Sequence, residues 1–260
     1  MFAGYCGALR YNRRAMTYCV AASVAEGIVF ASDSRTNAGI DHISTFGKMN
    51  IFETPGERVV VILTSGNLGT TQSVMSMLRQ RSKKSADVVP TGILGVATMF
   101  DVATLVGDTL REVVTRDGPV LAQQSIDPNC NFIVGGEIAG EPPRLFHVYP
   151  QGNFIEATRD TPYFQIGETK YGKPIIDRVV KEATPIREVA KCLLVSFDST
   201  MRSNLSVGLP IDLLAYEARS LKTALRHRFT EGDDYFRNLS QIWSAGLRKA
   251  FAEVPDVRWD

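Results

Sequence analysis

Short apolar runs separated by turn residues dominate the first part of the chain. The segments 17–24 and 28–36 flank a turn at 26–27, which predicts an antiparallel hairpin. Two further β-branched runs, 48–52 and 58–64, are separated by a Thr-Pro-Gly-Glu turn. The pattern therefore predicts four neighbouring strands at the start of the domain.

Helical spacing replaces this pattern further along the chain. Apolar residues recur at helical intervals after segment 69–71, which we expect to cap a helix, and the basic run 79–84 is expected to end it. A broad apolar stripe over 91–115 predicts a second helix, whose glycines at 92, 95 and 107 allow close packing. Two helices are thus expected to follow the first strands.

A second block of strands and helices completes the chain. Apolar runs at 131–136, 144–149 and 154–157 predict an antiparallel meander. Helical periodicity returns over 172–201 with a break near Thr184-Pro185, and a short strand and a helix at 238–251 follow. This order of strands and helices favours an α+β layered fold, and we expect residues 17–260 to form a single domain.

Composition and charge narrow the classes of function. The 260 residues are 44% hydrophobic and 22% charged, and 29 basic side chains nearly balance 28 acidic ones. This balance disfavours nucleic acid and anionic lipid as partners. No segment is apolar enough for a membrane span or a secretory signal, so we expect a cytoplasmic protein that does not bind membranes.

Cysteine and histidine spacing predicts no metal site. Cys19, Cys130 and Cys192 lie in apolar stretches and are expected to be buried thiols, and Cys6 forms no CxxC pair. The three histidines, at 42, 147 and 227, are far apart in the sequence. We therefore expect neither a metal nor another cofactor.

Three polar residues lie at the ends of the predicted strands. Thr17 begins the first strand, Asp33 ends the second, and Lys48 begins the third. A hairpin folded back on itself, with one more strand beside it, would bring all three together. A threonine hydroxyl alone is a poor nucleophile, but a free α-amino group has a pKa near ~8 and can accept its proton.

Longer runs resemble a known family. TYCVAASVAEGIVFASDSRT, GKMNIF and VVVILTSGNLGTTQ are similar to the beginning of proteasome β subunits and of their bacterial HslV relatives. The segments 164–172 and 202–208 fall where that family has its later active-site segments. Within this superfamily, runs 16–20 and 166–174 resemble the Anbu group of bacterial proteasome-like proteins.

This resemblance implies a fold and a chemistry. It implies a four-layer αββα sandwich of the N-terminal nucleophile hydrolase type, assembled into a homo-oligomeric ring. Thr17 would be the nucleophile with its own α-amine as base, Lys48 would lower the pKa of both groups, and Asp33 would orient Lys48. The N–H of Gly66 would bind the oxyanion, and Ser206 would hold the amine.

Two positions depart from the family pattern. Ser203 stands where most active proteasome subunits have an aspartate, and Glu168 stands where they have a serine. Both side chains are candidates for lining the site, and ordinary polar roles are the alternative. Family geometry also implies a substrate pocket that includes Thr36, Phe46 and Thr64.

The segment before Thr17 bears on activity, because an N-terminal nucleophile needs a free amine. Self-cleaving proteasome propeptides usually end in glycine, whereas Met16 precedes Thr17 here. We expect residues 1–16 to be a mis-assigned start or a segment that is removed, with translation beginning at Met16; a genuine tail that regulates or silences the site is the alternative.

The sequence therefore predicts a threonine-type amide hydrolase that cleaves peptides through an acyl-enzyme. Two alternatives remain open: an amidase for a non-peptide substrate, and a ring-forming scaffold or peptide-binding protein with a vestigial site. The sequence does not identify an ATPase partner.

Overall fold

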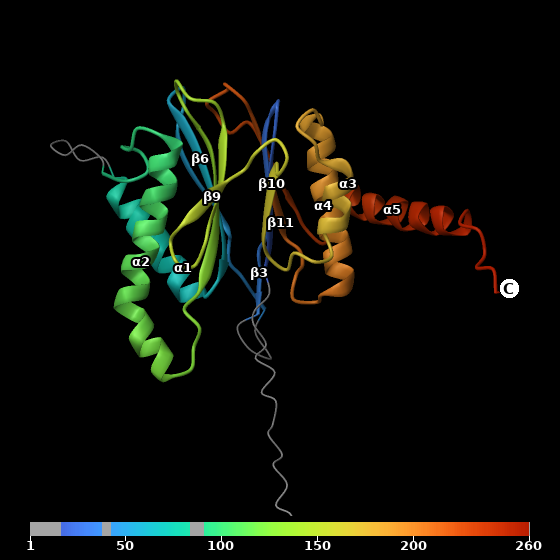
Figure 1. Cartoon of the computed structure of the whole chain (residues 1–260), viewed down its shortest axis with the longest axis horizontal. Helices are drawn as coiled ribbons and strands as arrows, with labels where there is room; N and C mark the ends of the chain where they lie inside the picture. Colours follow the sequence, from blue (N-terminus) through green and yellow to red (C-terminus); the bar gives the residue numbers. More distant parts are fainter. Residues whose placement is uncertain (1–16, 38–42, 84–90, 260) are drawn as a thin grey trace, which may run out of the picture.

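The structure is a computed structural model that describes residues 17–37, 43–83 and 91–259. The expectations for residues 1–16, including Cys6, and for His42 lie outside these residues. Two five-stranded sheets lie face to face with helices on both outer sides (Figure 1). This arrangement confirms the predicted αββα sandwich.

The first sheet contains the predicted N-terminal hairpin. Its strand order is β10-β1-β2-β11-β12, and every pair is antiparallel. The strands are β1 (Tyr18–Val24), β2 (Gly27–Asp33), β10 (Tyr163–Gly167), β11 (Ile211–Glu217) and β12 (Leu225–Phe229).

The second sheet has the order β5-β6-β7-β8-β9 and is also antiparallel. Its strands are β5 (Met49–Thr54), β6 (Arg58–Gly66), β7 (Cys130–Ile138), β8 (Arg144–Val148) and β9 (Phe154–Glu156). Two short strands, β3 (Arg35–Asn37) and β4 (Ile43–Thr45), pair with each other between β2 and β5.

Helices cover the outer face of each sheet (Figure 1). One side has α1 (Leu68–Arg81) and α2 (Met99–Gln123), and the other has α3 (Lys173–Val179), α4 (Ile186–Ser203) and α5 (Asp234–Ala252). Apolar clusters fill each helix–sheet layer and the space between the sheets. Burial of these three layers is the main source of stability.

The first two helices begin at other residues than predicted. The first helix begins at Leu68, because the Asn67 side chain accepts a hydrogen bond from Thr70 N, so segment 69–71 lies inside it. The second begins only at Met99, where Thr98 and Asp101 form a capping box, and it continues to Gln123. Residues 91–98 instead form turns, and Arg58 binds their carbonyl oxygens.

Strands after residue 160 differ from the prediction in number. Two strands, β11 and β12, precede α5 where one was expected, and β10 was not recognised as a strand. Three of the five residues of β12 are basic or histidine, and four are exposed, because β12 is an edge strand. The predicted meander β7–β9 and the break between α3 and α4 are confirmed.

Gly107 should be essential for packing α2. A Cβ at Gly107 would overlap the carbonyl oxygen of Gly152, whereas a Cβ at Gly246 in α5 would meet nothing within 4 Å. We expect Gly107→Ala to lower the free energy of unfolding by about 1–3 kcal/mol. The matched Gly246→Ala should raise it by about 0.5–1 kcal/mol. Urea unfolding measures both, and stabilisation by Gly107→Ala would contradict the packing.

Candidate active site

Thr17 lies directly before β1 and is held through its backbone. Thr17 is buried, with 7% of its surface exposed to solvent. Its carbonyl oxygen accepts a hydrogen bond from Glu168 N at 2.7 Å. Gly167 permits this contact, because its φ is +86° and a Cβ there would overlap the same carbonyl oxygen. The turn after β10 therefore packs against the predicted nucleophile.

Asp33 and Lys48 form a buried ion pair beside this position. Lys48 Nζ donates to Asp33 Oδ1 at 2.8 Å and to the carbonyl oxygen of Arg35 at 2.7 Å. The same Asp33 Oδ1 accepts the backbone N–H of Tyr18 at 3.0 Å. The structure thus joins Lys48 and the residue after Thr17 through one carboxylate oxygen.

Burial dominates the electrostatics of this pair. Desolvation raises the pKa of the Asp33 carboxyl from its ordinary 3.8 to about 6, although the charge of Lys48 opposes the shift. Asp33 Oδ2 is buried and has no hydrogen-bond partner among the described residues. Among the described residues, the hydrogen bonds to this carboxylate are therefore all made to Oδ1.

The end of β6 is hydrogen-bonded to Lys48 and to Cys19. Thr64 N donates to the carbonyl oxygen of Lys48 at 3.0 Å, and Cys19 Sγ donates to the carbonyl oxygen of Thr64 at 3.5 Å. Gly66 ends the strand with φ +112°, and a Cβ there would overlap the carbonyl oxygen of Asn129. Only glycine fits this backbone, which is the predicted oxyanion-binding position.

Glu168 and Ser206 are connected through a residue that the sequence did not single out. Asn204 Nδ2 donates to Glu168 Oε2 at 2.9 Å, and Ser206 N donates to Asn204 Oδ1 at 2.9 Å. Glu168 is buried, so its carboxylate depends on such donors. Ser203 lies apart from this chain of bonds, on the exposed end of α4.

The three predicted pocket residues differ in their surroundings. Thr64 is buried and bonded to the Lys48 segment, whereas Phe46 is 36% exposed. Thr36 belongs to β3, and its side chain lies outside the described part of the structure.

Like Asn204, Tyr18 is not marked as a functional residue by the sequence, because it is one aromatic residue within an apolar strand. Asn204 lies in the polar run between Ser203 and Ser206, and this run is the sequence signal that points to a functional role for it. Neither contact partner, Asp33 for Tyr18 or Glu168 for Asn204, is close in sequence.

Other candidate chemistry is limited among the described residues. Cys19, Cys130 and Cys192 are buried free thiols, as predicted, and burial raises the pKa of Cys130 and Cys192 to about 12. In residues 17–37, 43–83 and 91–259, no group of three or more His, Cys, Asp or Glu side chains could hold a metal ion. No helix in these ranges has the length and hydropathy to span a bilayer.

Solved structures provide close comparisons. The structure of "Anbu (ancestral beta-subunit)" from Yersinia bercovieri is 52% identical, covering 94% of this chain and 100% of that one, with a TM-score of 0.87. The helical assembly of the Anbu complex from Pseudomonas aeruginosa is 52% identical, covering 94% and 99%, with a TM-score of 0.88. Anbu from Hyphomicrobium sp. strain MC1 is 49% identical, covering 93% and 100%, with a TM-score of 0.84. No protein-family model and no curated protein matches the chain.

The shift at Asp33 predicts a specific dependence of stability on pH. Because the folded-state pKa of about 6 exceeds the ordinary 3.8, the folded protein binds this proton more tightly. The stabilising contribution is complete below about pH 4 and is lost as the pH rises through about 6.

We therefore expect the unfolding free energy of the wild type, relative to Asp33→Asn, to fall by roughly 3 kcal/mol over this window. Urea unfolding at a series of pH values measures the difference. Asp160→Asn, on an exposed turn, controls for the loss of a carboxylate. A rise in the difference between pH 4 and 6 would contradict the assignment.

Proposed function

This chain belongs to the Anbu family of proteasome-like β-subunit homologues, and we propose that it is a threonine-type amide hydrolase that cleaves peptides. The observation that carries the proposal is the single carboxylate oxygen of Asp33 that accepts both Tyr18 N and Lys48 Nζ, directly beside Thr17. A buried ion pair is costly to maintain for stability alone, which favours a catalytic role.

The first step is attack by the Thr17 hydroxyl. The free α-amine of Thr17 takes the hydroxyl proton, and the oxygen forms a bond to the carbonyl carbon of the substrate amide. The ammonium of Lys48 disfavours a second positive charge nearby, so it keeps the amine neutral and lowers the pKa of the hydroxyl. Asp33 holds Lys48 in place.

The tetrahedral intermediate then collapses to an acyl-enzyme. The N–H of Gly66 donates to the oxyanion, and the α-ammonium of Thr17 gives its proton to the leaving amine as the C–N bond breaks. In the second half, water gives a proton to the amine and attacks the ester. Release of the carboxylic acid restores the Thr17 hydroxyl.

The remaining polar groups support the amine. We assign this role to Ser206, whose backbone is tied through Asn204 to Glu168. Glu168 lines the site as a buried carboxylate where most active proteasome subunits have a serine. Ser203, which stands in place of their aspartate, is exposed, so the support of the amine differs from that of those subunits.

Thr64 and Phe46 are assigned to the substrate pocket together with Thr36. Thr64 is the member bonded directly to the backbone of Lys48, which connects the pocket wall to the catalytic pair.

Residues 1–16 must be absent from the active molecule, since the mechanism requires a free amine on Thr17. A small residue such as threonine after an initiator methionine favours removal of that methionine. We propose translation from Met16 followed by its removal, or excision of the whole segment.

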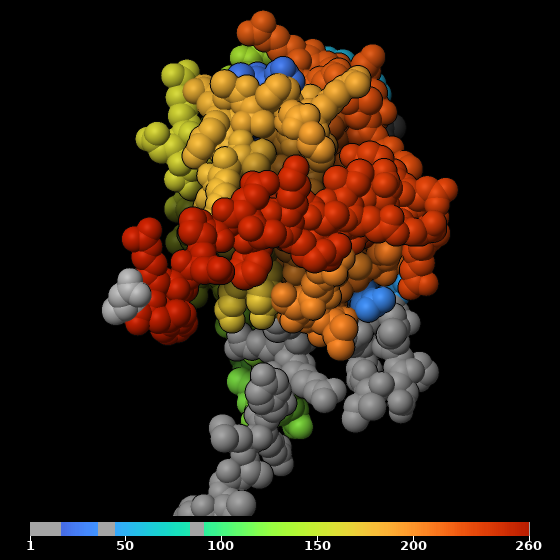
Figure 2. Space-filling model, turned by 90° about the vertical axis from the view of Figure 1, so that its right-hand side faces the viewer, coloured from blue at the N-terminus to red at the C-terminus, as the bar shows by residue number. Residues whose placement is uncertain are grey.

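A homo-oligomer is the proposed assembly, in keeping with the helical assembly described for the Pseudomonas aeruginosa relative. The last helix, α5, has apolar side chains on its surface for a contact between subunits. In α5 only Phe236 and Leu239 are buried, while Ile242, Leu247 and Phe251 are 65%, 53% and 80% exposed. Figure 1 shows α5, in red, extending away from α3 and α4, and Figure 2 shows the red segment in front of them. Exposed apolar side chains of this extent indicate a subunit contact.

Labelling with a peptide epoxyketone tests the chemistry, because this electrophile needs both the amine and the hydroxyl of an N-terminal threonine. We expect intact-protein mass spectrometry to find Thr17 as the first residue and to detect one adduct per chain. Thr17→Ala should abolish the adduct and lower amide hydrolysis by at least about 10³-fold.

Thr104→Ala, on the surface of α2, is the matched control and should label normally. A wild-type chain that begins at Thr17 but forms no adduct would contradict the proposal and favour the scaffold alternative. The differences between this chain and most active proteasome subunits at Glu168 and Ser203 are the observation that favours that alternative. Cleavage of small amides but not of peptides would favour an amidase.

Charges on the exposed face of α5 should reduce assembly. We expect Ile242→Asp with Phe251→Asp to lower the mass measured by light scattering after gel filtration, because carboxylates would enter an apolar contact. Asn238→Asp, an exposed polar position of α5, should leave the mass unchanged. An unchanged mass in the double variant, with helicity retained by circular dichroism, would exclude α5 as the contact.

A further inference from the structure

Tyr18 is a fully buried phenol adjacent in sequence to the proposed nucleophile. Its backbone N–H donates to Asp33 Oδ1 at 3.0 Å, the oxygen that also accepts Lys48 Nζ. Any displacement of residue 18 therefore moves Thr17 and one of the two donors to this carboxylate together.

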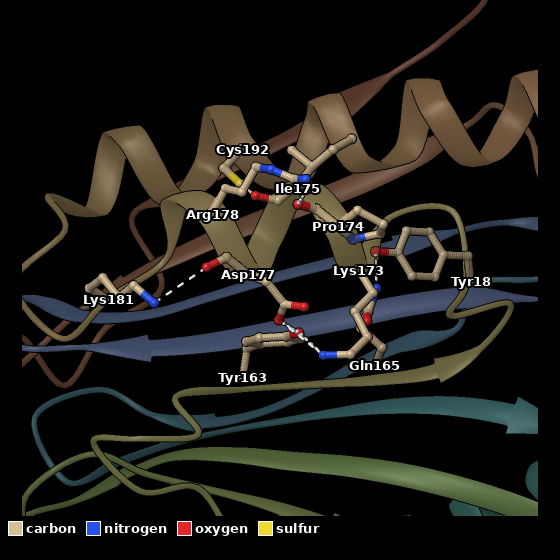
Figure 3. A network of polar contacts seen from close by, with 10 residues as sticks. All are labelled: Tyr18, Tyr163, Gln165, Lys173, Pro174, Ile175, Asp177, Arg178, Lys181 and Cys192. Carbon is tan, nitrogen blue, oxygen red and sulfur yellow. Dashed lines mark hydrogen bonds and ion pairs between the residues drawn. The ribbon is translucent and has the colours of Figure 1, made fainter. Parts of the chain in front are cut away.

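The hydroxyl of Tyr18 has one donor and one acceptor partner. Gln165 Nε2 donates to it at 2.7 Å, from β10 (Figure 3). Ser196 Oγ, on α4, lies 3.0 Å away and donates its own proton to the carbonyl oxygen of Leu193 at 2.6 Å. The Tyr18 hydroxyl must therefore donate to Ser196, which leaves it fully paired.

The space around the phenol is shaped to this hydroxyl. The Tyr18 ring packs on Phe197 of α4 with 4.5 Å between centroids. At the start of α3, a Cβ on Gly172 would overlap the Tyr18 hydroxyl oxygen. Side chains of β10 and α4 and the backbone before α3 thus determine where residue 18 lies.

We propose that Tyr18 is a positioning residue for the hydrolysis, and that its buried hydroxyl fixes the start of β1 to α4 and β10. This anchor holds Thr17 and the peptide N–H of residue 18 in register with the Asp33–Lys48 pair. The inference rests on the proposed function. Misplacement of reacting groups by an ångström costs about 10²-fold in rate, so a modest loosening of this anchor is sufficient to slow the reaction.

The same sheet contains a matched control. Tyr216 on β11 is also fully buried, and its hydroxyl donates to Glu137 Oε2 at 2.8 Å. It lies opposite Ile28 near the β1–β2 turn, whereas Asp33 lies opposite Ile211 at the other end of β11. Tyr216→Phe therefore removes a comparable buried hydrogen bond far from Thr17.

The test uses the purified protein that begins at Thr17, in wild-type form and as Tyr18→Phe, Ser196→Ala and Tyr216→Phe. Labelling by a tripeptide epoxyketone gives a maximal rate and a half-saturating concentration. We expect Tyr18→Phe to lower the maximal rate by about 10- to 100-fold with little change in half-saturation. Ser196→Ala should act in the same direction, and Tyr216→Phe should remain within about twofold of the wild type.

A second readout separates this inference from the proposed function. Hydrogen exchange by mass spectrometry on peptides covering 17–24 should be faster in Tyr18→Phe than in Tyr216→Phe, because the amide bonded to Asp33 is loosened. Wild-type rates of labelling and exchange in Tyr18→Phe, or equal slowing in Tyr216→Phe, would overturn the positioning role. If the wild type does not label at all, the proposed function fails, and exchange alone decides whether Tyr18 is an anchor.

Discussion

The buried carboxylate of Asp33 is the constraint on which the site depends. Its Oδ1 accepts the ammonium of Lys48 and the peptide N–H of Tyr18, so one oxygen joins the end of β2, the start of β5 and the start of β1. Burial works against the charged form and raises the pKa of this carboxyl to about 6. Such a pair contributes little net stability compared with apolar residues of the same volume, but removing one partner would leave an uncompensated buried charge.

The surrounding layers make this geometry rigid. The sheets meet through Cys19, Ile28, Phe30 and other buried side chains, and this inter-sheet layer places the end of β6 beside the start of β1. On the outer side of the first sheet, Tyr18 reaches α4, which connects the site to the second apolar layer. The backbone at Thr17 is thus held from both faces of its sheet, while the turn at Gly167 holds its carbonyl oxygen.

The groups proposed to support the amine differ from those of most active proteasome subunits. A buried carboxylate, Glu168, pairs with the amide of Asn204, which is a charge-assisted hydrogen bond between the turn after β10 and the residue after α4. The serine and aspartate of most active proteasome subunits are replaced here by groups with a different charge and a different reach. This difference changes the electrostatics around the proposed constellation of threonine, aspartate and lysine.

Local patterns determined much of the fold. The hairpin of β1 and β2, the strand pairs β5–β6 and β7–β9, and the break before α4 follow from apolar runs and turn residues, which act over a few positions. The run of residues from Thr17 to Lys48 also indicated the three groups of the proposed site. The strand β12 and the start of α2 did not follow, because an edge strand can be basic and a capping box can override an apolar stripe.

Only the tertiary structure decided which polar groups meet. The bond of Tyr18 to Ser196 joins residues 178 positions apart, and that of Asn204 to Glu168 joins residues 36 apart. No local spacing encodes these pairs, since they depend on how the sheets and helices stack. The sequence by itself therefore determined most of the strands and the candidate nucleophile, while sheet packing and long-range hydrogen bonds decided what holds that residue in place.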